Sequence, residues 1–363
     1  MSNSKTKPFG IRDKLGYMFG DFGNDFTFLL SSSFLMKFYT DVMGVDGYIV
    51  GIIMMVARFV DAFTDVAMGR ICDRSKMTPV GKFKPWIRRM CGPVVIVSFL
   101  MYQSGLSGLP QWAKIVYLTI TYILWGSVFY TSINIPYGSM ASAISDDPGD
   151  RQSLSTFRTM GGMFAGAFIM AGVPLMIYDK VNGNDILNGK RFTIIAGVCS
   201  ILAFICYILC YSLTTERVRT EASADAMRQN SVGNMLKNAL KNRALISIIV
   251  ASVFMLVSQL TIQQMANYVF PNYYGNAKAQ SLSMVVMGGG MLVAALIAKP
   301  LAKKIGKAEM SVIANMLAGV VCIILYFVRP QNVWVYVSFQ FLSWFGLGVF
   351  GRSQRTPRLL LVD

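Results

Sequence analysis

Hydrophobic residues occur along the chain in long runs, and short polar or basic segments separate the runs. Ten of these runs, with their flanks, approach the roughly 20 residues that an α-helix needs to cross a bilayer. The predicted spans cover residues 13–42, 47–70, 85–106, 112–137, 155–178, 192–214, 244–271, 279–300, 309–328 and 332–350. The pattern predicts an all-α, polytopic membrane protein with about ten transmembrane helices.

The composition also indicates that a lipid bilayer surrounds these helices. Hydrophobic residues make up 54% of the chain, charged residues make up 14%, and the mean hydropathy is +0.49. A soluble domain carries more charge, because charged side chains cover its surface. The formal net charge of +16 is also typical of nucleic-acid-binding proteins, but Lys and Arg lie here in alternating inter-helix segments. The sequence therefore predicts the bilayer as a partner, and no nucleic acid.

The distribution of Lys and Arg predicts the orientation of the chain. The basic segments are the N-terminus, residues 70–89, Arg151, residues 217–243, residues 299–307 and residues 352–358. The other set of connections contains fewer basic residues. By the positive-inside rule, we expect the N-terminus to be cytoplasmic in a multi-pass protein of the inner membrane.

One long polar segment divides the chain. We expect residues 1–214 to form a six-helix bundle, residues 215–243 a cytoplasmic linker, and residues 244–363 a second, incomplete bundle. Only about four helices follow the linker, so two of an expected twelve are predicted to be missing. The tail after Gly351 is abruptly polar and basic. An interrupted reading frame is the preferred interpretation of this tail, and an authentic short terminus is the alternative.

Ionisable residues inside the predicted spans point to function, because each costs at least roughly 2.5–3.5 kcal/mol to insert. Arg58, Asp61 and Asp65 fall on one face of the second span, Asp25 lies on the first, and Arg158 on the fifth. If they share one cavity, three carboxylates and two guanidiniums leave one negative charge for Na⁺, Li⁺ or a proton to neutralise. In the alternative interpretation, Arg58 and Asp61 only hold helices together. Asp21 is expected to be solvated.

The fourth span carries a second group of polar and aromatic side chains. Its members are Tyr122, Trp125, Tyr130, Thr131 and Asn134. Aromatic rings stack on the apolar faces of sugars, and amides bind sugar hydroxyls, so the group predicts a sugar site. Packing at a helix interface is the alternative for each ring. We expect the Asn134-Ile-Pro-Tyr137 step to interrupt the helix.

Other chemistries lack their sequence signatures. The chain contains no histidine, no glycine-rich phosphate loop followed by Lys-Ser/Thr, and no metal-type spacing of cysteines. We therefore expect no enzymatic activity, no cofactor, and no metal beyond a coupling cation.

Several motifs occur in order across roughly the first 160 residues and resemble those of one transporter family. They are Lys14-Leu-Gly-Tyr17, Gly23-Asn-Asp25-Phe, Phe38-Tyr-Thr-Asp41-Val, Ala57-Arg-Phe-Val-Asp61-Ala-Phe-Thr-Asp65, Gly81-Lys-Phe-Lys-Pro-Trp86, Asn134-Ile-Pro-Tyr137 and Asp150-Arg151 with Arg158. Together they resemble the glycoside–pentoside–hexuronide:cation symporters, which are melibiose-carrier-like members of the major facilitator superfamily. The resemblance implies secondary sugar transport coupled to Na⁺ or H⁺.

By the same resemblance, Asp61 and Asp65 are cation ligands, with Thr131 nearby. Asp25 and Arg158 match residues that hold sugar hydroxyls, and Tyr130 belongs to the same pocket. Gly69 and Asp73 match a gating loop between the second and third helices. Asn24, Asn134 and Gly138 stand where the melibiose carrier has Lys, Asp and Trp, which favours the pentoside and glucuronide branch.

Two alternatives to sugar–cation symport stay open from the sequence. The first is a truncated, non-transporting remnant or a sugar-binding membrane sensor. The second is a major facilitator for a non-sugar solute. Neither the particular sugar nor the choice among Na⁺, H⁺ and Li⁺ follows from the residues.

Overall fold

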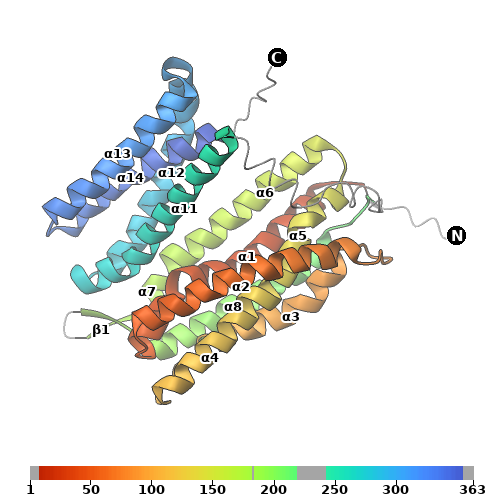
Figure 1. Cartoon of the computed structure of the whole chain (residues 1–363), viewed down its shortest axis with the longest axis horizontal. Helices are drawn as coiled ribbons and strands as arrows, with labels where there is room; N and C mark the ends of the chain where they lie inside the picture. Colours follow the sequence, from red (N-terminus) through yellow and green to blue (C-terminus); the bar gives the residue numbers. More distant parts are fainter. Residues whose placement is uncertain (1–7, 182–183, 219–242, 355–363) are drawn as a thin grey trace. The chain divides into compact units, whose positions relative to one another are not determined.

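A computed structural model of the chain describes residues 8–181, 184–218 and 243–354, which are almost entirely helical (Figure 1). The helices are α1 (Ile11–Lys37), α2 (Gly47–Arg74), α3 (Lys84–Leu100), α4 (Gln111–Ile123), α5 (Thr131–Ile144), α6 (Pro148–Ala167), α7 (Val173–Ile177), α8 (Gly189–Leu213), α11 (Arg243–Tyr268), α12 (Ala277–Ile305), α13 (Lys307–Val328) and α14 (Val333–Gln354). Strands β1 (Tyr178–Val181) and β2 (Asn184–Leu187) form a two-stranded sheet.

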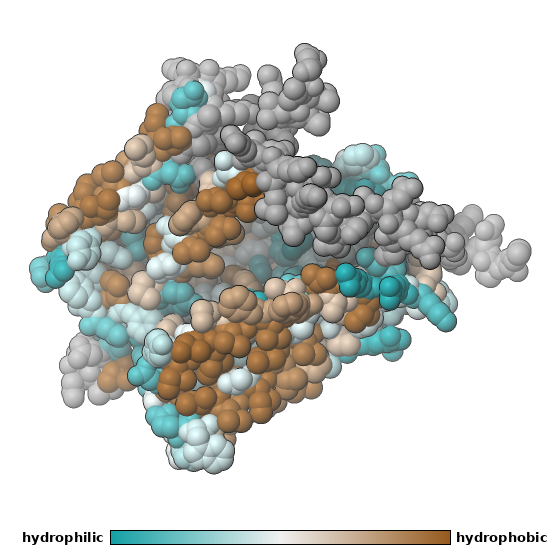
Figure 2. Space-filling model, viewed as in Figure 1, coloured by the Kyte–Doolittle hydropathy of each residue, from teal (hydrophilic) through white to brown (hydrophobic). Residues whose placement is uncertain are grey.

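Helix occupies each of the ten predicted spans, so the predicted all-α membrane fold is confirmed. Within the described residues, four helical stretches are long and apolar enough to cross a membrane. These are Gln111–Ile144, Pro148–Ile177, Gly189–Leu213 and Ile249–Tyr273, and Val312–Val328 and Val333–Val349 are shorter apolar helices. Large apolar side chains are exposed on these helices, as Val116 and Ile120 of α4 are. Figure 2 shows the resulting broad hydrophobic surface, which suits lipid contact.

The chain forms two compact units. Unit 1 contains Met1–Ile169 and Leu187–Ser252, and unit 2 contains Met170–Ile186 and Val253–Asp363. The predicted boundaries at residues 214 and 244 stay predictions, because residues 219–242 of the linker lie outside the described residues. The tail 355–363 lies outside them as well.

Helix α1 is the central packing element of unit 1, and it contacts both α6 and α8. Glycine makes this close approach possible. A Cβ atom added at Gly20 would lie 2.2 Å from the Tyr137 ring, and one at Gly23 would lie 2.9 Å from the Tyr207 ring. The two tyrosines are nearly fully buried, so larger residues at these glycines would force the helices apart.

The fourth predicted span is irregular at a different place from the one expected. Helix α5 continues through Pro136 to Ile144, so the expectation that the Asn134-Ile-Pro step breaks the helix is wrong. The irregular turn is instead π-helical and covers Leu124–Tyr130. The backbone N–H of Thr131 donates to the Gly126 carbonyl, five residues earlier, as the hydrogen bonds of a π-helix do.

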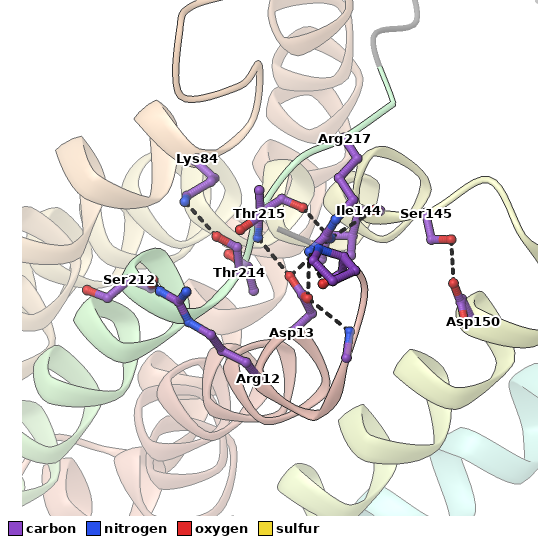
Figure 3. Close-up of polar contacts among 12 residues, drawn as sticks. Arg12, Asp13, Lys84, Ile144, Ser145, Asp150, Ser212, Thr214, Thr215 and Arg217 are labelled. Atoms are coloured by element: carbon purple, nitrogen blue, oxygen red, sulfur yellow. Dashed lines mark hydrogen bonds and ion pairs between the residues drawn. The ribbon is translucent and has the colours of Figure 1, made fainter. Parts of the chain in front are cut away.

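The segment Thr214–Val218, here called the clasp, follows α8 and binds the ends of other helices in unit 1. Arg217 forms an ion pair with the buried Asp13 of α1, with Nη2 2.8 Å from Oδ2. The backbone N–H of Thr215 also donates to Asp13, at 2.9 Å. Figure 3 shows Asp13 enclosed by these donors, and Lys84 beside them donating to the Thr214 carbonyl.

The clasp also closes the start of α3 and the end of α5. The Glu216 carboxylate accepts hydrogen bonds from the backbone N–H groups of Lys82, Phe83 and Lys84 at 2.6, 3.0 and 2.7 Å. These donors lie at the N-terminus of α3, where backbone N–H groups have no partner within the helix. The backbone N–H groups of Arg217 and Val218 both donate to the Ala143 carbonyl. Five residues therefore bind three helix ends.

The apolar helices of unit 2 contain uncharged polar side chains and long stretches without charged residues. The sequence has no Asp, Glu, Lys or Arg in residues 279–298, 310–328 or 330–351. Some of its described buried polar side chains pair with one another instead. Gln280 donates to Asn267 at 2.5 Å, and Ser283 donates to Gln340 at 2.5 Å.

Candidate functional site

A cavity of about 330 Å³ lies in unit 1 between α2 and the π-helical turn that leads into α5. Its lining includes most of the residues predicted from the second and fourth spans. The lining residues are Phe28, Arg58, Asp61, Ala62, Asp65, Trp125, Gly126, Tyr130, Thr131 and Asn134. The charged group of the second span and the aromatic group of the fourth span, which the sequence analysis treated separately, therefore line one cavity.

The two carboxylates of α2, Asp61 and Asp65, have different partners. Asp61 Oδ2 lies 3.1 Å from Arg58 Nη1, and Asp61 Oδ1 accepts a hydrogen bond from Ser127 Oγ. Asp65 Oδ1 accepts from Thr131 Oγ1 at 2.8 Å. Among the residues that the structure describes, no basic side chain lies within ion-pair distance of Asp65. Within this part of the chain, Asp65 thus has a hydroxyl partner and no ion-pair partner.

Arg58 is held from two sides. Arg58 Nη2 donates a hydrogen bond to the Tyr122 hydroxyl at 2.5 Å. The guanidinium carbon lies 5.7 Å from the centre of the Tyr122 ring. Tyr122 is not part of the cavity lining, so its place beside the site comes through Arg58. The ion pair between Arg58 and Asp61, on which the alternative interpretation depends, is present, and the role of Arg58 stays a prediction.

Aromatic rings form the other side of the cavity. Trp125 and Tyr130 have their ring centres 5.3 Å apart, and Tyr130 stacks on Phe28 of α1 at 5.6 Å. Asn134 accepts a hydrogen bond from Asn24, which in turn accepts from Tyr207. A ring platform beside an amide is the arrangement that binds the faces and hydroxyls of a sugar.

Asp25 and Arg158 lie on a neighbouring patch built by α1 and α6. Arg158 Nε lies 2.9 Å from Asp21 Oδ1, and the guanidinium lies 5.3 Å from the centre of the Tyr137 ring. A Cβ atom at Gly162 of α6 would lie 2.8 Å from Asp25 Oδ2 and 3.1 Å from Asp21 Oδ2. The two carboxylates therefore converge on one point of α6, with a single arginine beside them.

The structure corrects the expectation that Asp21 is solvated. Asp21 is only 9% exposed and forms an ion pair with Arg158. Ser127, Phe28 and Asn24 were missed as well. One signal was available, since Asp21 precedes Asp25, and Ser127 precedes Thr131, by the four residues that separate Asp61 from Asp65.

Gly69 and Asp73 lie at the last turns of α2 and are not part of the cavity lining. The backbone carbonyl of Asp73 accepts a hydrogen bond from Lys82 Nζ at 2.9 Å. This contact ties the end of α2 to the loop before α3. The gating role of the loop stays a prediction.

A charged and aromatic cavity inside a bundle of apolar helices defines a membrane transporter of small solutes. The sequence as a whole agrees. Residues 16–353 match the family model described as MFS/sugar transport protein, and the chain belongs to this family of major facilitator transporters. It is accordingly a multi-pass membrane protein and a secondary transporter, not an enzyme. The predicted resemblance to glycoside–pentoside–hexuronide symporters is confirmed at this level.

Named relatives and a solved structure are similar along most of the chain. The inner membrane symporter YicJ of Escherichia coli is 28% identical over 331 residues, which are 90% of this chain and 68% of YicJ. The isoprimeverose transporter of Lactiplantibacillus pentosus is 28% identical over 86% of this chain and 64% of its own length. The crystal structure of a D-xylose-proton symporter has a TM-score of 0.61 at 13% identity, covering 94% of this chain and 80% of that one. This last similarity concerns the fold alone.

Proposed function

We propose that the chain is a symporter that moves a sugar or glycoside together with Na⁺, Li⁺ or a proton. The observation that carries the proposal is the pair of unequal carboxylates, of which Asp61 has an arginine partner and Asp65 has none. An unpaired carboxylate inside a membrane protein is costly, so binding a monovalent cation beside it would lower the energy of the loaded state.

The rest of the cavity supports a sugar as the second ligand. Trp125, Tyr130 and Phe28 offer ring faces, and Asn134 offers an amide in the same cavity lining as the carboxylates. A relative that is named an isoprimeverose transporter also favours a glycoside. The two ligands would stabilise each other's binding, because coupling between two sites is reciprocal. We further propose alternating access, with a cytoplasmic N-terminus, as the transport cycle.

The test is sugar binding by the purified chain with and without Na⁺, across a panel of glycosides, pentosides and hexuronides. We expect Na⁺ to strengthen binding of at least one of them, and Asp65→Asn to abolish that effect. Asp46→Asn is the matched control, because Asp46 caps the start of α2 outside the cavity and Asn caps equally well. Equal Na⁺ stimulation in Asp65→Asn and in the unchanged chain would contradict the proposal, and binding of a non-sugar solute alone would favour the second alternative.

A further inference from the structure

Two hydroxyl groups face the two carboxylates of α2 in register. Ser127 and Thr131 are four residues apart, as are Asp61 and Asp65, and this spacing places each pair one helical turn apart on one face. Ser127 donates to Asp61 Oδ1, and Thr131 donates to Asp65 Oδ1. The site thus consists of two carboxylate–hydroxyl pairs stacked along the helices.

The π-helical turn is what brings Ser127 to Asp61. Ser127 lies inside this turn and is 2% exposed. Its neighbour Gly126 has no side chain, and a Cβ atom there would lie 3.8 Å from Asp61 Oδ1. The backbone of the turn at Gly126 and the hydroxyl of Ser127 therefore both lie next to Asp61 Oδ1.

Arg58 contacts Oδ2 of Asp61 and leaves Oδ1 as the oxygen that a cation can reach without displacing the guanidinium. Asp61 Oδ2 is engaged by the guanidinium at 3.1 Å, and Tyr122 holds the guanidinium in place. A cation that sits beside Asp65 and also uses Asp61 must approach Oδ1, where the Ser127 hydroxyl already lies.

We propose that Ser127 is a ligand of the coupling cation, together with Asp61, Asp65 and Thr131. This inference rests on the proposed cation symport. A serine hydroxyl both donates and accepts hydrogen bonds. Its hydrogen is donated to Asp61, and its oxygen lone pairs are available to Na⁺ or Li⁺.

The experiment measures Na⁺ and Li⁺ binding to the purified full chain by calorimetry, at constant ionic strength with choline chloride. We expect Ser127→Ala to weaken Na⁺ affinity about tenfold, the loss typical of one hydrogen bond to a charged group. Ser127→Thr keeps the hydroxyl and should restore the affinity.

Ser132→Ala is the matched control. Ser132 lies on the same helix and contacts α2 through Met68 Sδ at 3.6 Å, with no carboxylate involved. Its removal should leave Na⁺ affinity unchanged. Equal losses in the Ser127 and Ser132 variants would overturn the inference, because both hydroxyls would then act through packing.

The failures of the two proposals are distinguishable. If Asp65→Asn abolishes Na⁺ binding while Ser127→Ala binds Na⁺ normally, cation coupling stands and the role of Ser127 is overturned. If Asp65→Asn also binds Na⁺ normally, the assignment of the cation to Asp65, which carries the proposed function, is overturned. A loss of sugar affinity in Ser127→Ala with unchanged Na⁺ affinity would assign Ser127 to the sugar and overturn the inference as well.

Discussion

Unit 1 contains two acidic pairs that are alike in sequence and different in surroundings. Asp21 and Asp25 are four residues apart on α1, Asp61 and Asp65 are four apart on α2, and in each pair the first aspartate has an arginine partner. The pair on α1 converges on Gly162 and on Arg158, which lies over a tyrosine ring. The pair on α2 faces two hydroxyls across a cavity.

The difference teaches how one charge pattern can serve two ligands. Carboxylate and hydroxyl oxygens are suitable ligands for a bare cation, and the pair on α2 presents both. A guanidinium, a ring and a carboxylate suit the hydroxyls of a polyol, and these are what the α1 pair presents. Under the proposed symport, we expect a division in which α2 holds the cation and α1 contributes to the sugar.

The largest expected effect comes from removing the two arginines in turn. Arg158→Ala would leave Asp21 buried and unpaired beside Asp25, and we expect it to lower the free energy of unfolding by about 2 kcal/mol, a reduced figure because Arg158 is partly exposed. Arg58→Ala should cost less, about 1 kcal/mol, because Asp61 keeps its bond to Ser127. Thermal unfolding in detergent measures both, and equal losses would contradict the comparison.

An intermediate effect is expected from the clasp, which contacts neither acidic pair. Glu216→Ala removes the acceptor of three backbone N–H groups and should lower the free energy of unfolding of the chain by about 1 kcal/mol. Sugar and Na⁺ affinities should not change. A change in either would mean that loosening unit 1 is enough to disturb the sites, and the effects of the arginine variants would need the same explanation.

Glu216 also predicts a pH dependence. Burial raises the pKa of Glu216 above its ordinary value, although the three N–H donors oppose the rise. Between the ordinary and the raised pKa, the folded protein holds a proton that the unfolded chain has released. Stability from this group is thus present at low pH and falls as the pH rises through the raised pKa. Glu216→Gln should flatten the pH dependence of the unfolding temperature, and an unchanged slope would contradict this.

The smallest expected effect tests the convergence on α6. Gly162→Ala places a methyl group against Asp25 and Asp21, and their flexible carboxylates can move aside. We expect sugar affinity to fall a few-fold, about 0.5–1 kcal/mol, while Na⁺ affinity is unchanged. Gly166→Ala on the same helix is the control, since its methyl would meet Leu29 at an ordinary 3.8 Å. If Na⁺ affinity fell instead, the division between α1 and α2 would be wrong.

The fold was largely predictable from the sequence, and the site only in part. Helix placement follows from hydrophobic run length, which depends on local sequence and bilayer thickness. Asp61, Asp65 and Arg58 were predicted together because one helix carries all three. Thr131 was expected near them only through the family resemblance, Asn134 was assigned to the separate sugar group, and the cavity lining includes both.

Ser127 and the burial of Asp21 were missed for a physical reason. Each depends on contacts between helices, which a single sequence does not display. Asp21 is buried by Arg158 and Gly162, more than a hundred residues away. The π-helical turn changes which side chains of the fourth span face α2, and its sequence Leu-Trp-Gly-Ser-Val-Phe-Tyr does not announce that geometry. Pro136 was the visible signal, and the helix continues through it.

The clasp has a consequence for how the protein is made. Arg217 and Asp13, which form one of its ion pairs, are 204 residues apart in the chain. During synthesis the N-terminal helix must wait in the translocation machinery or the lipid until the sixth span and the residues after it have emerged. Until then the buried carboxylate of Asp13 has no arginine. The contacts between the clasp and α1 therefore form only after residue 217 has been made, and the N-terminal helix spends the earlier part of synthesis without them.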